Sequence, residues 1–243
     1  MIKQVRFSNS VKFFEKGFCE RWNMHPYNDI NAPCFFAGVY SQEDVDAINK
    51  HKAFKVILNT GKVREIFLNI NKENVVVMEG WINCDFIRFK YPMKHVYIPL
   101  KDFSMFKPNT MGKKVYCYLG NKAMQDSMGF GLMEKLKKAI PYEVIYGYQG
   151  HPIEFVKKNY YDECFINIKP NVVGGFTTAQ ELAHMGRMTI SNALAPFCKP
   201  YSDIAEICHL INKESKKIGT IQPSCMGKFY NTGEEWKQVK FWQ

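Results

Sequence analysis

The feature that most constrains this fold is an alternation of apolar runs and amphipathic helices that occurs twice along the chain. In its first occurrence, an apolar run at residues 33–40 leads into a helix that Ser41 can cap, and a second apolar run follows at residues 54–59. Apolar runs of this length joined by a helix are typical of neighbouring parallel strands with a crossover helix between them. The pattern therefore predicts an α/β protein built on parallel sheets.

The alternation is interrupted once, at residues 101–111, where Pro108 and polar side chains replace the apolar pattern. It then restarts with an apolar run that ends at Gly120 and continues through further strand-like runs and helices. A length of 243 residues suits one large domain or two small ones. We therefore expect two Rossmann-like domains, residues 1–108 and residues 109–243, with one continuous sheet as the alternative.

Composition and charge narrow the class of protein without naming a partner. A hydrophobic content of 46% with 23% charged residues is that of a folded globular chain. The formal net charge of +10 favours polyanions such as nucleic acid or sugar phosphates. Because the basic residues are spread over both halves of the chain, a generally basic surface is favoured over a dedicated nucleic-acid face.

The cysteines and the hydropathy of the chain indicate its compartment. The 8 cysteines include no CxxC pair, and several lie in apolar runs, as buried reduced thiols do. No apolar run is long enough to act as a signal sequence or to cross a membrane. We expect a cytoplasmic protein with no membrane span.

The segment at residues 164–192 carries the clearest indication of chemistry. Gly174 and Gly175 stand between a buried strand-like run and the start of a helix, where they permit close approach of a ligand to the backbone. Thr177 and Thr178 supply hydroxyls and N–H groups at the positive end of that helix, which suits a diphosphate. A glycine-containing turn followed by an ordinary capped helix explains the same residues equally well.

Two charged residues flank this turn. Glu181, four residues after Thr177, can accept hydrogen bonds from the hydroxyl pair of a ribose. Lys169, at the end of the preceding strand-like run, can oppose the charge of a phosphate. The alternative for Glu181 is a favourable interaction with the helix dipole alone.

The sequence of residues 164–192 resembles the C-terminal nucleotide-sugar site of GT-B-fold glycosyltransferases, and is especially similar to compact viral and phage-type members. Residues 35–61 and 106–121 also resemble that group, so the likeness spans most of residues 33–192. The positions that match its pattern are Gly174, Gly175, Thr177, Glu181, Leu182, Met185, Gly186 and Arg187. The resemblance implies a GT-B-like arrangement, in which two Rossmann-like domains face each other across a cleft.

The resemblance also implies roles for individual residues. The second domain would bind a nucleotide-sugar donor, UDP- or GDP-linked, with Glu181 on the ribose and Lys169 as the catalytic residue that stabilises the leaving group. The donor-binding residues implied are Tyr118, Gly120, Asn121, Gly174, Gly175, Thr177, Thr178 and Glu181. The residues implied on the acceptor side are Gly38, Tyr40, Asn59 and Gly61.

The implied reaction moves a sugar to a hydroxyl of a glycan or of a hydroxylated DNA base, in the host cytoplasm if the protein is viral. No metal and no cofactor besides the donor is expected, because the only DxD motif, Asp44 to Asp46, falls in the first turns of an expected helix. Many members of the family carry an acidic residue before the glycines, whereas residues 170–173 contain none. Retention and inversion of the sugar therefore both stay open.

Two other classes of function are compatible with parts of the sequence. A noncatalytic binding or scaffold protein would keep the GT-B-like shape without a catalytic base. An NAD-dependent oxidoreductase ranks last, because the glycines at residues 129–131 lack the third glycine of the dinucleotide-binding motif.

Overall fold

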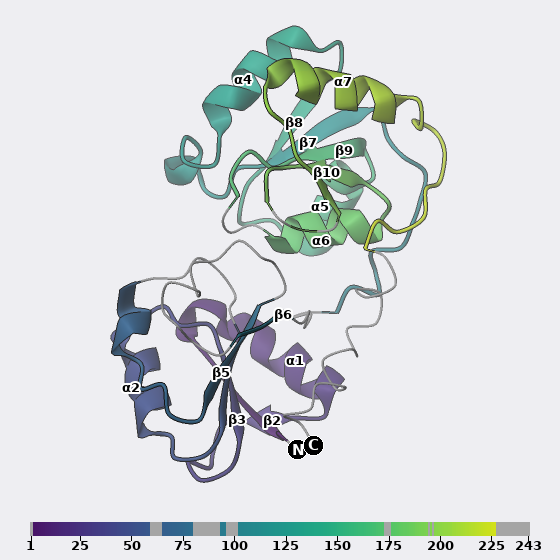
Figure 1. The fold of residues 1–243 in the computed structure, drawn as a ribbon. Helices are drawn as coiled ribbons and strands as arrows, with labels where there is room; N and C mark the ends of the chain where they lie inside the picture. Colours follow the sequence, from purple (N-terminus) through teal and green to yellow (C-terminus); the bar gives the residue numbers. More distant parts are fainter. Residues whose placement is uncertain are drawn as a thin grey trace. The chain divides into compact units, whose positions relative to one another are not determined.

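The computed structural model shows two α/β units, each built on its own parallel sheet (Figure 1). The chain passes from the first unit to the second between Asp102 and Phe103. Every pairing between strands in either sheet is parallel. The predicted fold class, two Rossmann-like domains, is confirmed. The structure describes residues 2–58, 65–79, 93–95, 102–172, 176–193, 195 and 197–226.

The first unit has a six-stranded sheet in the order β2-β1-β3-β4-β5-β6. Its helical segments are η1 (Asn9–Phe14), α1 (Glu15–Trp22), α2 (Gln42–Lys50) and η2 (Glu65–Asn69). Its strands are β1 (Gln4–Phe7), β2 (His25–Pro26), β3 (Cys34–Ala37), β4 (Lys55–Leu58), β5 (Val75–Glu79) and β6 (Met93–His95).

Helices cover both faces of this first sheet. Phe18 of α1 packs with Phe35 of β3 in one buried cluster. Ile48 of α2 packs with Phe36 of β3 in a second cluster. Because neighbouring residues of a strand point to opposite faces, these contacts place α1 and α2 on opposite sides of the sheet.

The second unit has a five-stranded sheet in the order β11-β10-β9-β7-β8. Its helical segments are η3 (Lys122–Met124), α4 (Phe130–Ala139), α5 (Ile153–Val156), the π-helical turn η4 (Lys157–Tyr161), α6 (Phe176–His184) and α7 (Ile204–Ser215). Its strands are β7 (Lys114–Tyr118), β8 (Val144–Gly147), β9 (Cys164–Ile168), β10 (Met188–Ile190) and β11 (Cys198–Lys199).

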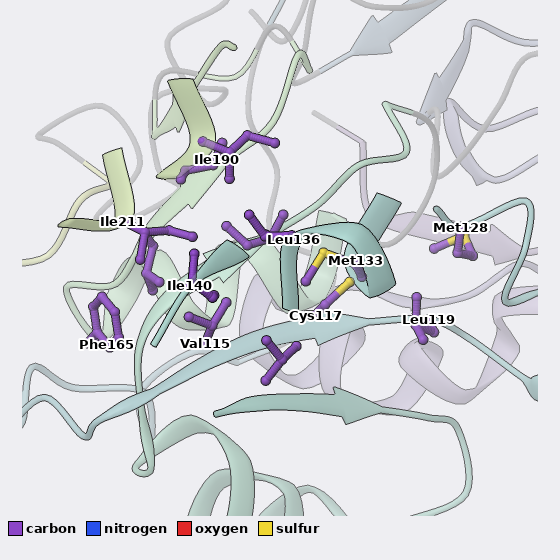
Figure 2. Packing of buried hydrophobic residues seen from close by; sticks show 14 of the residues in the cluster. Val115, Cys117, Leu119, Met128, Met133, Leu136, Ile140, Phe165, Ile190 and Ile211 are labelled. Carbon is purple, nitrogen blue, oxygen red and sulfur yellow. The ribbon is translucent and has the colours of Figure 1, made fainter. Parts of the chain in front are cut away.

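Successive side chains of β7 point to opposite faces of the second sheet. Val115 and Cys117 belong to the apolar core with α4 and α7, where Leu136 and Ile211 also pack (Figure 2). Tyr116 belongs to a second cluster on the side of α5 and α6. The first face is a continuous apolar core, and the second carries most of the polar groups described below.

Gly147 is required by the packing of Tyr116. A Cβ atom at position 147 would clash with the hydroxyl and the ring of Tyr116, which is 1% exposed. We expect Gly147→Ala to lower the free energy of unfolding by about 1–3 kcal/mol, because a buried ring has to shift. Thermal unfolding measures this. Gly131→Ala in α4 is the matched control, since nothing lies within 4 Å of the added Cβ, and equal losses in both variants would contradict the packing argument.

The segment that enters the second unit packs closely on it. Phe103 stacks on His184 with ring centroids 4.8 Å apart, and Phe106 lies 6.2 Å from the ring of Tyr161. Both phenylalanines are buried and precede the expected domain boundary at residue 108. The residues that the sequence indicates as a linker therefore contribute core contacts to the second unit.

Arg187 fixes this segment further. Its side chain has no exposed surface and donates hydrogen bonds to the backbone carbonyls of Cys164, Met185, Asn109 and Thr110. The bond to Met185 lies at the end of α6, where a cation is favourable. Arg187 therefore joins the end of α6 to the entering segment.

Candidate functional site

The order of the strands marks the candidate site in the second unit. β7 is the first strand of its sheet, β8 lies on one side of it, and β9, β10 and β11 lie on the other. The winding of the chain therefore reverses between β7 and β9. Ligands of open α/β sheets bind outside the carboxyl ends of the strands at such a reversal. The segments that follow β7 and β9 are accordingly the candidate site.

The end of β7 and the segment after it contain three of the predicted donor-binding residues. Tyr118 is the last residue of β7, and Gly120 follows with φ +74°, a left-handed conformation that favours glycine. The carbonyl of Gly120 accepts a hydrogen bond of 2.9 Å from the backbone of Gln149, which follows β8. The side chain of Asn121 accepts one of 2.9 Å from the backbone of Met124. These bonds hold the backbone in place at the end of β7.

The segment after β9 contains Lys169 and packs against the segment after β7. Lys169 is 6% exposed, and its Nζ donates a hydrogen bond to the carbonyl of Asn171. The Asn171 Nδ2 donates in turn to the carbonyl of Ser127, at 3.2 Å. Gly129 has φ +96°, and a Cβ atom there would clash with Pro170. The two segments that flank the reversal are thus in direct contact.

Burial changes the electrostatics of Lys169. Removal from water lowers the pKa of Lys169 to about 8. Burial raises the pKa of the neighbouring thiols of Cys198 and Cys117 to about 12, so both are neutral at pH 7. An anion that bound beside Lys169 would favour its charged form. A buried ammonium group of this kind at a strand end is a candidate for anion binding.

Glu181 lies in a second group of polar residues on α6 and its neighbours. It is 3% exposed and accepts a hydrogen bond from the hydroxyl of Tyr161. The side chain of Thr178, three residues earlier on α6, hydrogen-bonds to the same tyrosine. Burial raises the pKa of Tyr118, the hydrogen bond to Gln149 opposes the rise, and the charge of Glu181 adds to it. The structure therefore brings together Tyr118, Thr178 and Glu181.

A buried amide lies near the end of β9. Asn167 is 2% exposed and lies two residues before Lys169 in the sequence. Its Nδ2 donates a hydrogen bond of 3.0 Å to the hydroxyl of Thr189. Among the residues that the structure describes, nothing hydrogen-bonds to its Oδ1. The polar groups near this strand end are therefore not all used within the fold.

Of the remaining predicted donor-binding residues, only Thr177 lies within the residues that the structure describes. Thr177 is half-buried in the first turn of α6. Gly174 and Gly175 lie outside the described residues, so the diphosphate turn itself stays a prediction.

Tyr161 and Gln149 were missed by the sequence reasoning. Tyr161 ends the π-helical turn before β9, and Gln149 follows β8. Neither belongs to a motif. The pairing of β7 with β8 brings Gln149 near Tyr118, and the packing of α6 on the turn before β9 brings Tyr161 to Glu181. No pattern in the sequence indicates that either residue lies at the site.

On the acceptor side, Gly38 and Tyr40 lie just after β3, at the carboxyl end of the first sheet. Gly38 has φ +81°, and its N–H donates to the carbonyl of Leu58 at 3.0 Å. The other two predicted acceptor-side residues, Asn59 and Gly61, lie outside the described residues.

The strand order of the first sheet also reverses between β1 and β3, but a carboxylate lies at this point. Asp44 is 2% exposed and accepts hydrogen bonds from Ser8, Arg6 and the backbone of Tyr40 at 2.8–2.9 Å. Burial would raise the pKa of Asp44, but these bonds and one from Ser41 outweigh it and lower the pKa. The resulting negative charge disfavours an anion here, in contrast to the second unit.

Neither metal-binding clusters nor membrane spans are found in the described ranges. No group of three or more His, Cys, Asp and Glu side chains in those ranges is arranged to hold a metal ion. None of the helices described has the length and apolar character that crossing a bilayer requires. Comparison with models of known protein families, and with curated protein sequences, found no significant match.

Proposed function

We propose that the second unit binds a nucleoside-diphosphate sugar at the carboxyl ends of β7 and β9, and that the protein transfers the sugar to a hydroxyl acceptor. The observation that carries the proposal is the burial of Lys169 at the point where the strand order reverses. A buried cation is costly to keep, so its presence at the position where α/β folds bind ligands supports a functional role. A diphosphate would place negative charge beside this cation, in addition to the carbonyl of Asn171 that its Nζ already contacts.

The ribose is the second element of the proposal. Glu181 is a carboxylate in the α6 helix that follows β9, and its charge acts on Tyr118 at the end of β7. Carboxylates that accept hydrogen bonds from both hydroxyls of a ribose are a common way to hold nucleotides in Rossmann-like folds. We propose that Glu181 binds the donor ribose, with Thr177 and Thr178 near the diphosphate.

The strand order is compatible with the GT-B resemblance. Doubly wound nucleotide-binding sheets have the order 3-2-1-4-5-6 or 2-1-3-4-5. Counted from β7, the second sheet has the order 2-1-3-4-5. In both orders the chain reverses next to the first strand, where nucleotides bind, so the order supports a nucleotide site at the carboxyl end of β7.

The proposed chemistry depends on the leaving group. The bond between the anomeric carbon and the oxygen of the β-phosphate breaks, and the acceptor oxygen forms a new bond to that carbon. The ammonium of Lys169 would stabilise the negative charge that develops on the departing diphosphate. The proton of the acceptor goes to the departing phosphate in a retaining reaction, or to a base in an inverting one.

The acceptor and the compartment belong to the same proposal. We propose Gly38 and Tyr40 on the acceptor side, and a glycan or a hydroxylated DNA base as the acceptor. The cysteines in the described residues are all free, which supports a reducing cytoplasmic location.

A noncatalytic nucleotide-binding protein is the second candidate. The observation that favours it is the segment Pro170 to Val172, which carries no carboxylate to act as a base. Such a protein would bind a nucleoside diphosphate at Lys169 without turning over a donor.

The test of the proposed function is turnover of a panel of UDP-, GDP-, CDP- and ADP-sugars, followed as release of the nucleoside diphosphate. The wild-type protein should hydrolyse or transfer from at least one donor, and Lys169→Met should not. Lys137→Met is the matched control, because Lys137 is exposed on α4 and the change in net charge is the same. Binding without turnover would favour the second candidate, and neither binding nor turnover would refute both.

The pH dependence of binding gives a separate prediction. With a pKa of about 8, Lys169 is about nine-tenths charged at pH 7 and about one-tenth charged at pH 9. We expect the affinity for the best nucleoside diphosphate to fall about tenfold between these pH values, measured by calorimetry. Lys169→Arg should bind with a flat profile, because a guanidinium stays charged throughout. The same decline in both proteins would contradict the role of Lys169.

A further inference from the structure

We propose that Tyr161 orients the carboxylate of Glu181 for the ribose of the donor, and so lets the site distinguish ribonucleotides from 2′-deoxyribonucleotides. The inference rests on the proposed function and adds to it a residue that carries selectivity. Tyr161 is a positioning residue, because it acts through Glu181.

The contacts of Tyr161 join two residues of the same helix. Its hydroxyl donates to one carboxylate oxygen of Glu181, and the side chain of Thr178 hydrogen-bonds to the same tyrosine. Thr178 and Glu181 are three residues apart on α6 and therefore neighbours on its surface. Tyr161 thus bridges two residues that the sequence independently indicates for the donor.

The ring of Tyr161 is fixed by its surroundings. It is 2% exposed and packs edge-to-face on Tyr116, with centroids 5.4 Å apart and an interplanar angle of 82°. Phe106 lies on it as well, at 6.2 Å. Tyr161 also ends a π-helical turn, a rare conformation that is frequent at functional sites. The direction of its hydroxyl is therefore set by packing rather than by Glu181.

Because the Tyr161 hydroxyl is held in place, its hydrogen bond fixes the orientation of the Glu181 carboxylate, and so the directions from which that carboxylate can accept further hydrogen bonds. An ionised carboxylate has about four acceptor positions in one plane. The bond from Tyr161 occupies one position and sets the orientation of that plane. A ribose that presents two hydroxyls to an oriented carboxylate can donate two hydrogen bonds to it, whereas a 2′-deoxyribose can donate only one. Sites of this kind reject the analogue that lacks the hydroxyl.

The chain contains a matched control for the loss of this hydroxyl. Tyr146 on β8 donates a hydrogen bond of 2.7 Å to Glu134 on α4. The pair has the same chemistry as Tyr161 and Glu181 and lies in the same unit. Tyr146 packs in the apolar cluster that contains α4, and neither Tyr146 nor Glu134 is a residue of the proposed donor site. Tyr146→Phe therefore removes an equivalent hydrogen bond elsewhere.

The experiment measures the binding of ADP, GDP, CDP and UDP by calorimetry, and then compares the tightest binder with its 2′-deoxy counterpart. We expect the wild-type protein to prefer the ribonucleotide about tenfold or more. In Tyr161→Phe, the ribonucleotide should bind about tenfold more weakly, while the 2′-deoxy affinity changes by less than about twofold. Tyr146→Phe should keep the wild-type ratio.

Each contrary outcome has a distinct meaning. If the wild-type protein binds none of the four nucleotides, the proposed function fails. If it binds without a preference for ribose, or if Tyr161→Phe keeps the preference or weakens both ligands equally, the inference alone is overturned.

A crystal structure of the wild-type protein with the ribonucleotide that binds most tightly keeps the test decisive if Tyr161→Phe does not fold. We expect the Tyr161 hydroxyl to stay bonded to one carboxylate oxygen of Glu181 while the ribose hydroxyls bond to the same carboxylate. A ribose bound to Glu181 with the Tyr161 hydroxyl no longer on the carboxylate would overturn the inference alone.

Discussion

Replacing Lys169 with methionine should weaken nucleotide binding and at the same time make the protein more stable. The binding loss follows from removal of a charged hydrogen-bond donor, which is worth about tenfold to 150-fold in affinity. The stability gain follows because methionine fills a similar volume and carries no charge to bury. Calorimetry measures the first effect and urea denaturation the second.

The stability gain should depend on pH in a defined window. The pKa of Lys169 is about 8 in the folded protein, against an ordinary value of 10.5. Between these values the unfolded chain binds more protons than the folded one, so wild-type stability rises with pH there. Burial of the charge therefore costs up to about 3 kcal/mol below pH 8 and nothing above pH 10.5. The advantage of Lys169→Met should shrink across this window.

Lys137→Met again serves as the control and should change neither binding nor stability by more than about 0.5 kcal/mol. A decrease in the stability of Lys169→Met at pH 7 would mean that Lys169 serves chiefly to hold the carbonyl of Asn171. That result would remove the main support for an anion site at this strand end.

Replacing Arg187 with methionine should lower the free energy of unfolding of the second unit by about 3–5 kcal/mol. The variant removes the donor from the carbonyls of Met185, Asn109 and Thr110, whereas the carbonyl of Cys164 keeps the N–H of Gly112. Two of them belong to the segment that enters the unit, so its packing should loosen as well. Urea denaturation followed by near-ultraviolet circular dichroism measures the effect.

Arg187→Lys is the informative control for charge. It keeps the positive charge but has three donors on one atom, which cannot match the spread of the guanidinium fork. We expect it to recover less than half of the lost stability. Full recovery in Arg187→Lys, or a loss below about 1 kcal/mol in Arg187→Met, would show that the fork geometry is unimportant.

The fold was predictable because its signals are local. Apolar runs separated by capped helices indicated parallel strands, and the capping box of Ser41 and Asp44 is present as expected. Its presence also agrees with the interpretation of the DxD motif as a helix start. The packing of Phe103 and Phe106 on the second unit was not predictable, because their partners His184 and Tyr161 are far away in sequence and no local pattern connects them.

The candidate site was predictable to a smaller extent. Tyr118 and Lys169 could be placed at strand ends because a parallel strand shows as an apolar run with a definite end. The partner of Glu181 could not be found in this way. Tyr161 reaches it from the helical turn before β9, and only the three-dimensional packing of α6 on that turn brings the two together.

A crystal structure of the protein soaked with the nucleoside diphosphate that binds it most tightly tests the proposed donor site most directly. We predict diphosphate density within hydrogen-bond distance of the Nζ of Lys169, and ribose density at the carboxylate of Glu181. A nucleotide bound elsewhere in the second unit, or one bound in the first unit beside Asp44, would contradict it.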